Sequence, residues 1–543
     1  MSHKGDEVLS VRGLRVSYAG APALRGIDLS LRRGEILAVV GESGSGKSTL
    51  TRALLGLLPA SAHSDGSIVL AGIEVTARTA PGLRGGTVSL VPQDPGASLD
   101  PVRSIGSQLR ETLRLGPGAR RASRAELGAR AAELLASVGI DRPEERLRQY
   151  PHELSGGQKQ RVLIALAFSR HPEVLVADEP TSALDVTVQR TVLETFTRVA
   201  REQGSAVVFI THDIAVATDL ADRVLVLRHG EVIETDTVPR LAAGAASEYT
   251  RTLLAEVLFA GAGVGSGCKD DAASTGTGHA PAEPPALRLS GVSKRFGHGA
   301  AARTVLHDVD LTLPRGRTLA LVGESGSGKS TTARIAMLLS APDVGTVEIH
   351  GRDVTGASGA LRRETWRSLQ LVHQNPDRSL DPRWSVERIV AEPLRYGAAT
   401  GAPERAAAVG RALESVKLAD RLRHALPGEL SGGQRQRVAI ARALAVGATT
   451  LVLDEALSAL DVVTQNHVLD LLAELQAEHR LSYLFISHDL AVVERFSDAT
   501  AVLAGGRVVE AGPTARLFAD PRADATRALL DARPGTRLRE LVA

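Results

Sequence analysis

Two stretches of the chain carry the residue types that bind phosphate. Each has glycine, four variable residues, glycine, lysine and a hydroxyl residue, and each follows a short apolar run. Glycines let backbone N–H groups converge on phosphate oxygens, the lysine reaches the β- and γ-phosphates, and the hydroxyl can ligate Mg²⁺. The candidate residues are Gly41, Glu42, Ser43, Gly44, Ser45, Gly46, Lys47, Ser48 and Thr49, and again Gly323, Glu324, Ser325, Gly326, Ser327, Gly328, Lys329, Ser330 and Thr331.

Other chemistry-bearing residues also stand at the ends of apolar runs. Asp178 and Asp454 end such runs, which places a carboxylate where it can hold Mg²⁺ directly or through water. The runs predict strands over residues 36–40, 174–177 and 206–210, and helices over 50–58 and 120–138. Alternating strands and helices indicate an α/β fold with a mostly parallel sheet.

The whole set of motifs occurs twice in the same order, which indicates a duplicated domain. The same number of residues separates Leu154 from Leu430, Asp178 from Asp454, His212 from His488 and Thr250 from Thr526. At 543 residues the chain also exceeds the ~250–300 residues at which single cores stop growing. We therefore predict a first domain over 1–259 and a second over 286–543.

Residues 260–285, between the repeats, are rich in small residues and proline and predict a flexible linker. A linker of this length typically reaches roughly 30 Å, enough for the two domains to pair within one chain.

Bulk composition excludes several classes of function. A net charge of +2 from 64 basic and 62 acidic residues gives no strong field for binding nucleic acid. A single cysteine, Cys268, cannot build a disulfide, a four-thiolate zinc site or a cysteine-bound metal cluster. The first eight residues lack the apolar core of a secretory signal, and the apolar runs are too short to span a bilayer. We expect a cytoplasmic chain whose channel, if it serves a membrane, is supplied by other subunits.

The sequence LSGGQ, followed downstream by an apolar strand that ends in Asp-Glu, makes the chain resemble the ATP-binding-cassette ATPases. The resemblance covers nearly all of both repeats. It implies two P-loop NTPase domains, each with a mostly parallel sheet, an antiparallel β-subdomain and a helical subdomain. It also implies that ATP and Mg²⁺ are the cofactors.

In that family two cassettes pair head to tail, so that each ATP lies between one glycine loop and the other signature. Lys47 would then work with the second signature, and Lys329 with the first. A helix that starts near the signature glutamine would aim its N–H groups at the γ-phosphate. The signature residues are Ser155, Gly156, Gly157 and Gln158, and Ser431, Gly432, Gly433 and Gln434.

The resemblance also gives roles to residues that local pattern alone does not assign. Glu179 and Glu455 match the general base or water-orienting residue, and His212 and His488 match the histidine that contacts the γ-phosphate. Gln93 and Gln374 match the glutamine that joins the nucleotide site to the membrane partner, and we also count them among the Mg²⁺ ligands. Tyr18 and Phe296 stand where adenine would stack, although core packing is an alternative explanation for both rings. Since both sets are intact, we predict two hydrolytic sites.

The segments after the two glutamines point to a class of transporter. They read QDPGASLDP and QNPDRSLDP, similar to the Q-[DN]-P-x-x-S-L-[DN]-P stretch of dipeptide, oligopeptide and nickel importer ATPases. Tyr249 and its following residues fit the same class, whereas the second repeat has Ala525 at that place. The resemblance implies two transmembrane permease subunits, an extracytoplasmic solute-binding protein and a peripheral position on the cytoplasmic face of the membrane.

Two other readings of a double cassette stay open. A soluble translation factor acting on ribosomes also has two cassettes, but would be expected to carry a long charged helical linker. An importer ATPase for another small solute, such as a sugar, commonly has one altered site. The substrate cannot be read from this chain, because binding protein and channel select it.

Overall fold

The structure is a computed structural model that describes residues 7–116, 121–181, 184–259, 283–297, 302–374, 376–396, 401–458 and 460–542. Contacts divide the chain into two compact units, Met1–Leu258 with Arg533–Ala543, and Phe259–Ala532. This grouping differs from the predicted division at the C-terminal end, because residues 533–543 pack with the first unit. The predicted linker lies outside the described residues as far as residue 282.

The first unit contains two sheets of different character. A four-stranded antiparallel sheet has the order β2-β1-β4-β5, and a six-stranded sheet has the order β10-β9-β3-β8-β7-β6. In the larger sheet only β10 runs antiparallel to its neighbour. The strands are β1 Glu7–Tyr18, β2 Ala21–Arg32, β3 Ile36–Val40, β4 Ala62–Leu70, β5 Ile73–Glu74, β6 Val88–Val91, β7 Val174–Asp178, β8 Ala206–Thr211, β9 Arg223–Arg228 and β10 Glu231–Thr237.

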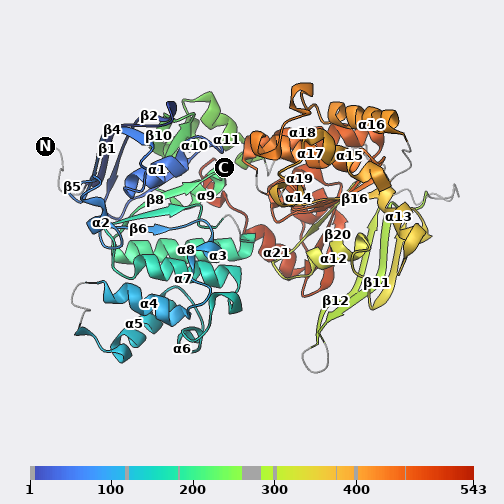
Figure 1. Cartoon of the computed structure of the whole chain (residues 1–543). Coiled ribbons are helices and arrows are strands. Elements are labelled where there is room, and N and C mark those ends of the chain that lie inside the picture. Colours follow the sequence, from blue (N-terminus) through green and yellow to red (C-terminus); the bar gives the residue numbers. More distant parts are fainter. Residues whose placement is uncertain are drawn as a thin grey trace. The chain divides into compact units, whose positions relative to one another are not determined.

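Helices cover the larger sheet and build a separate subdomain. Figure 1 shows α7 and α8 next to the central sheet, with α4, α5 and α6 on the far side of those two helices. The helices are α1 Lys47–Leu54, α2 Ala80–Leu83, α3 Pro95–Ser98, α4 Ile105–Arg114, α5 Arg124–Ser137, α6 Pro143–Arg146, η2 Pro151–Glu153, α7 Gly156–Phe168, α8 Val186–Gln203, α9 Ile214–Leu220, α10 Val238–Gly244, α11 Glu248–Phe259 and α22 Thr536–Val542.

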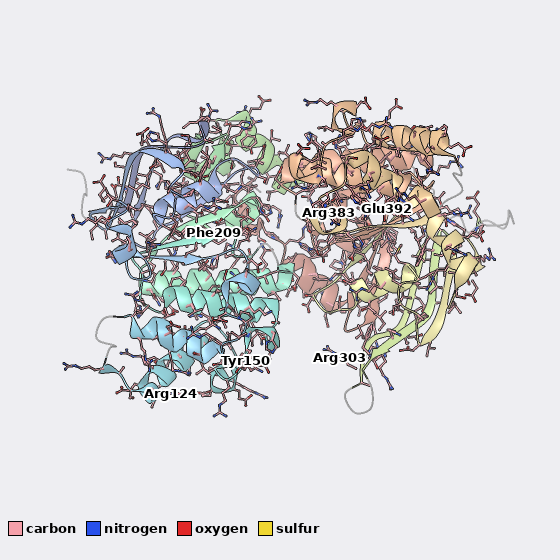
Figure 2. All side chains as sticks on the ribbon, in the orientation of Figure 1. Arg124, Tyr150, Phe209, Arg303, Arg383 and Glu392 are labelled. Atoms are coloured by element: carbon pink, nitrogen blue, oxygen red, sulfur yellow. The ribbon has the colours of Figure 1, made fainter. Side chains whose placement is uncertain are left out.

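Strand β3 separates the two hydrophobic cores of this unit. Its five residues are all buried, as expected for a parallel strand covered on both faces. Ile36, Ala38 and Val40 belong to the core shared with α7, α8 and α9, whereas Leu37 and Val39 belong to the core shared with β1, β2 and α1. Period-two alternation thus anchors the strand that carries the glycine loop from both sides. In Figure 2, Phe209 of β8 lies well inside the unit, while Arg124 and Tyr150 lie in the outlying helical subdomain.

The second unit repeats both sheets, in the orders β12-β11-β14-β15 and β16-β17-β18-β13-β19-β20. Its strands are β11 Leu287–Phe296, β12 Arg303–Leu313, β13 Thr318–Val322, β14 Val344–Ile349, β15 Arg352–Asp353, β16 Leu369–Val372, β17 Thr450–Asp454, β18 Ser482–Ile486, β19 Ala499–Ala504 and β20 Arg507–Pro513. Its helices are α12 Lys329–Ala336, α13 Gly359–Ser368, α14 Pro376–Ser379, α15 Val386–Ala391, η4 Pro393–Tyr396, α16 Ala402–Ser415, η5 Asp420–Leu422, η6 Pro427–Glu429, α17 Gly432–Leu444, α18 Val462–His479, α19 Leu490–Phe496, α20 Thr514–Ala519 and α21 Asp524–Asp531. The predicted α/β class, with mostly parallel sheets, antiparallel β-subdomains and helical subdomains, is confirmed.

Some predicted helix ends are shifted by local chemistry. The helix after the first glycine loop covers Lys47–Leu54 rather than 50–58, because Gly56 turns left-handed at φ 60° and ends it. Helix α5 begins at Arg124 rather than at residue 120, because Ser123 and Glu126 form a capping box at its start. Within the described part of the chain, no helix has both the length and the apolar character to cross a bilayer.

Candidate active site

The first glycine loop joins the buried end of β3 to the first turn of α1. At Gly41 an added Cβ would lie 2.1 Å from the carbonyl oxygen of Leu227, so only glycine fits there. Gly46 adopts φ 107°, and a Cβ there would lie 2.7 Å from the side chain of Leu24. These two close approaches restrict the path of the loop.

The loop lysine lies against its own loop. Lys47 Nζ donates to the carbonyl oxygens of Gly41, at 2.6 Å, and Glu42, at 2.9 Å. Lys329 makes the same two bonds to the first two residues of its loop, at 2.7 and 2.9 Å. Both ammonium groups are therefore held against the first two residues of their own loops, beside the predicted phosphate site.

Both loops fit phosphate on evidence independent of the motif. The Oγ atoms of Ser45 and Ser327 are buried and have no hydrogen-bond partner among the described residues. Helices α1 and α12 have Gly46 and Gly328 as their N-cap residues, and neither helix has a side-chain cap. The N–H groups at a helix N-terminus, with a buried hydroxyl beside them, favour an anion.

An acidic pair stands at the end of β7, the strand next to β8. Asp178 is the last residue of β7, and Glu179 comes directly after it. Burial raises the pKa of Asp178, and the neighbouring charge of Glu179 raises it further, against the opposing effects of Thr51 and Lys47. Burial and Glu455 likewise raise the pKa of Asp454. Asp178 therefore lies beside Thr51 and Lys47 of the helix that follows the glycine loop.

Glu179 lies between two polar side chains from remote segments. Its Oε2 accepts a hydrogen bond from Gln93 Nε2 at 2.8 Å, and its Oε1 lies 3.2 Å from His212 Nδ1. Glu455 Oε2 accepts from Gln374 Nε2 at 2.7 Å and lies 3.7 Å from His488 Nδ1. The structure thus brings three predicted site residues together in each unit.

This contact shifts both partners toward their charged forms. Burial alone would raise the pKa of Glu179, but the hydrogen bond and charge of His212, with Lys47, bring it below its usual value. Burial alone would lower the pKa of His212, yet Glu179 raises it. For Glu455 the contact with the imidazole of His488 is the main cause of a lowered pKa, and the pKa of His488 is raised.

Both glutamates have strained backbones. Glu179 has φ 45° and Glu455 has φ 48°, in the left-handed region that residues with a Cβ rarely adopt. The backbone N–H of Glu179 donates to Ile210 at 2.9 Å, and that of Glu455 to Ile486 at 2.9 Å, which holds the strain in place. Strain of this kind gathers at functional sites.

The signature residues cap helix α7. Ser155 Oγ accepts from the N–H of Gln158 at 3.3 Å, and Gln158 Oε1 accepts from the N–H of Ser155 at 3.0 Å. Gly157 is buried, and an added Cβ would lie 2.4 Å from Val188 of α8. Ser155 and Gly156 are exposed at the helix start. Gly157 therefore packs against α8, whereas Ser155 and Gly156 are exposed to solvent.

The second signature has the same arrangement. Ser431 and Gln434 form the same capping box at the start of α17. An added Cβ at Gly433 would lie 2.5 Å from Thr464 of α18.

The two candidate adenine-stacking residues stand in different surroundings. Tyr18 is partly buried, and its hydroxyl lies 3.5 Å from Thr49 Oγ1 in the helix after the glycine loop. Phe296 is 45% exposed, with Lys294 Nζ 5.6 Å from its ring centroid. Both rings lie at the ends of their strands β1 and β11. Stacking on adenine stays a prediction for each.

The sequence patterns do not identify Thr51 and Tyr249 as neighbours of the first glycine loop. Thr51 lies one helical turn after Lys47 and stabilises the charged form of Asp178. Arg228 stacks on the ring of Tyr249 at 4.4 Å, and burial together with the nearby Glu42 raises the pKa of that tyrosine. In the sequence, Tyr249 indicates only the transporter class. Nothing in the pattern connected it with a loop residue so far away along the chain.

The described residues contain no group of three or more histidine, cysteine, aspartate or glutamate side chains that could hold a metal ion. Mg²⁺ is usually bound by one or two carboxylates together with substrate phosphates. Asp178, the exposed hydroxyl of Ser48 and the amide oxygen of Gln93 offer that kind of donor set.

Comparison with known proteins supports these observations. The family described as "ABC transporter" matches residues 24–182 and 306–458. The chain is 40% identical over 542 residues to the peptidoglycan transport ATP-binding protein YejF of Agrobacterium fabrum, covering 97% of this chain and 96% of that protein. It is 39% identical over 565 residues to the glutathione import ATP-binding protein GsiA of Escherichia coli, covering 97% and 89%.

One solved structure, cbiO1 from Clostridium perfringens, part of the ABC transporter complex cbiONQ, aligns at 26% identity. It covers 44% of this chain and 92% of that one, with a TM-score of 0.41.

Proposed function

Because this chain belongs to the ATP-binding proteins of the ABC transporter family, we propose that it powers an importer of peptides or peptide-like solutes. Family membership, the double cassette and ATPase activity were predicted from the sequence, and the matches to both halves confirm them. The observation that carries the proposal is the duplicated cluster of glutamine, glutamate and histidine beside an intact glycine loop. Both halves therefore have the parts for hydrolysis.

The peptide substrate is supported by the two relatives and by the sequence after the glutamines. One relative is named for glutathione, which is a tripeptide, and the other for peptidoglycan, which contains peptide chains. The segments QDPGASLDP and QNPDRSLDP are of the peptide and nickel importer type. Nickel is the other substrate of that importer class, and the test below distinguishes nickel from peptide.

In the proposed catalytic cycle, Lys47 and the N–H groups of α1 bind the phosphates, and Glu179 orients the attacking water. Gln93 and His212 hold the carboxylate in place. Mg²⁺ would be held by Asp178, Ser48 and Gln93 and would neutralise phosphate charge. The second unit repeats these roles with Lys329, Ser330, Gln374, Asp454, Glu455 and His488.

We also propose that the two sites are composite, with each ATP between the glycine loop of one cassette and the signature of the other. The exposed Ser155 and Ser431, at the starts of α7 and α17, support this arrangement. The cassettes are taken as residues 1–259 and 286–543 joined by a linker over 260–285, with the terminal residues returning to the first unit. Pairing would occur within one chain.

The proposed partners are two transmembrane permease subunits and an extracytoplasmic solute-binding protein, with the chain held at the cytoplasmic face of the membrane. The test is ATP hydrolysis by the purified chain, alone and in proteoliposomes with the permeases encoded beside it. Stimulation by binding protein loaded with peptide supports the proposal. Stimulation only by a nickel- or sugar-loaded binding protein, or only by ribosomes, would refute the peptide assignment and identify one of the alternatives.

A further inference from the structure

Residues 533–542 pack on the first unit, although the second unit precedes them in the sequence. Helix α22 contacts α9 and α10. Leu538 is fully buried and belongs to the same hydrophobic core as Ile214 and Val216 of α9. This burial makes the chain end a part of the first unit's core.

Hydrogen bonds fix the entry of this segment. Asp219, near the end of α9, accepts from the N–H of Gly535 at 2.6 Å and from the N–H of Arg537 at 3.0 Å. The guanidinium of Arg537 donates to the carbonyl oxygen of Ala221 at 2.9 Å. A carboxylate that accepts two backbone N–H groups specifies one register for the docked segment.

Gly535 shows how closely the segment is packed. It adopts φ 87°, and an added Cβ would lie 2.4 Å from Val257 of α11 and 3.3 Å from Ala215 of α9. The segment is therefore inserted between two helices of the first unit.

Helix α9 is directly connected to the catalytic cluster. Its N-cap, Asp213, accepts from the N–H groups of Ala215 and Val216 and is the next residue after His212. His212 in turn contacts Glu179 at 3.2 Å. Movement of α9 would therefore move the imidazole relative to the carboxylate.

The second unit holds its equivalent helix by other means. At the place of Asp219 in the repeat stands Arg495, which donates to Asn466 at 2.6 Å and to Asp470 at 2.8 Å, both on α18. A guanidinium has no acceptor atom for backbone N–H groups. The docking surface for residues 533–543 is thus specific to the first unit.

We propose that residues 533–543 form an internal clasp that fixes α9 and holds His212 on Glu179, so that turnover at the first catalytic site depends on the C-terminal end of the chain. Asp219 and Leu538 are positioning residues in this arrangement. The clasp makes the two sites unequal although their catalytic residues are the same.

The test compares Leu538→Ser with Leu541→Ser, a matched change at a residue that is 45% exposed. Amide hydrogen exchange of the full chain is followed in α9 and α19, and ATP hydrolysis is measured on the same samples. We expect Leu538→Ser, but not Leu541→Ser, to speed exchange in α9 and leave α19 unchanged. The turnover number should fall by up to about half, the share of one of two sites, with KM for ATP little changed.

A milder variant and a rescue separate the clasp from general unfolding. Asp219→Asn should give a smaller change in the same direction, and a synthetic peptide of residues 533–543 should restore protection and turnover to a chain ending at Ala532. Equal exchange in α9 for the two leucine variants would overturn the docking. Faster exchange in α9 with unchanged turnover, or equal loss of protection in α19, would overturn the control of His212.

Discussion

At the scale of single residues, the proposed catalytic glutamates are held by an amide on one side and an imidazole on the other. The lowered pKa of Glu179 keeps its carboxylate ionised, which suits a group that orients water. The raised pKa of His212 favours the protonated imidazole beside it, near the proposed place of the γ-phosphate. The residues therefore stabilise each other's charges.

Glu179→Gln and Glu455→Gln, made singly, should each leave ATP binding intact and reduce turnover. The amide keeps the hydrogen bond but cannot serve as a base, and such groups contribute about 10²–10⁴-fold. Nucleotide affinity and steady-state hydrolysis measure the two effects. If one substitution is silent, the prediction of two hydrolytic sites is wrong.

The His–Glu contacts also predict how stability depends on pH. The folded pKa of His212 and His488 is raised, so their stabilisation is complete below about pH 6.5 and is lost as pH rises through the folded pKa. The folded pKa of Glu179 and Glu455 is lowered, so their stabilisation is present above about pH 4.5 and is lost as pH falls through that lower value.

We therefore expect the double variant His212→Gln with His488→Gln to flatten the decline in stability above about pH 6.5. Chemical denaturation at about pH 6 and about pH 9 measures the slope. His467→Gln, at an exposed position on α18, is the control and should keep the slope of the unsubstituted chain. An unchanged slope in the double variant would contradict the assignment.

At the scale of elements, α7 and α8 pack so closely that a signature glycine is required between them. Gly157→Ala should destabilise the first unit by about 1–3 kcal/mol, because the new methyl group overlaps Val188. Gly156→Ala, whose Cβ would lie 3.7 Å from Leu184, should cost much less.

Adding Val188→Ala to Gly157→Ala should recover part of the lost stability, since it removes the overlapping atoms. Thermal unfolding of the unsubstituted chain, the single variants Gly157→Ala and Val188→Ala, and the double variant completes the cycle. Failure of the second change to compensate would mean that the glycine is needed for its backbone and not for helix packing.

At the scale of the whole molecule, the proposed composite sites predict which residues are energetically coupled. Effects on ATP affinity at the first glycine loop should be non-additive for Lys47→Ala with Ser431→Ala, because both would contact one nucleotide. Lys47→Ala with Ser155→Ala is the matched control and should be additive. The reverse result would place each nucleotide within a single cassette.

Much of the fold and site could be predicted from sequence because their signals are local. Strand β3, the glycine loops and the acidic pairs are short runs whose spacing sets their backbone path, and the duplication is visible by comparing one half of the chain with the other. The start of α1 at Lys47 was harder to predict, since apolar periodicity begins only at Leu50.

Only the tertiary structure decided which segments that are remote in sequence make contact. Gln93 and Glu179 are 86 positions apart, and the clasp bond from Gly535 to Asp219 spans 316 positions. The left-handed backbone of Glu179 and the overlap that forbids a side chain at Gly157 are likewise set by neighbouring elements. Residue types and spacing determine which chemistry a chain can perform, whereas packing decides which remote groups meet, because burial of apolar surface and not local propensity brings them together.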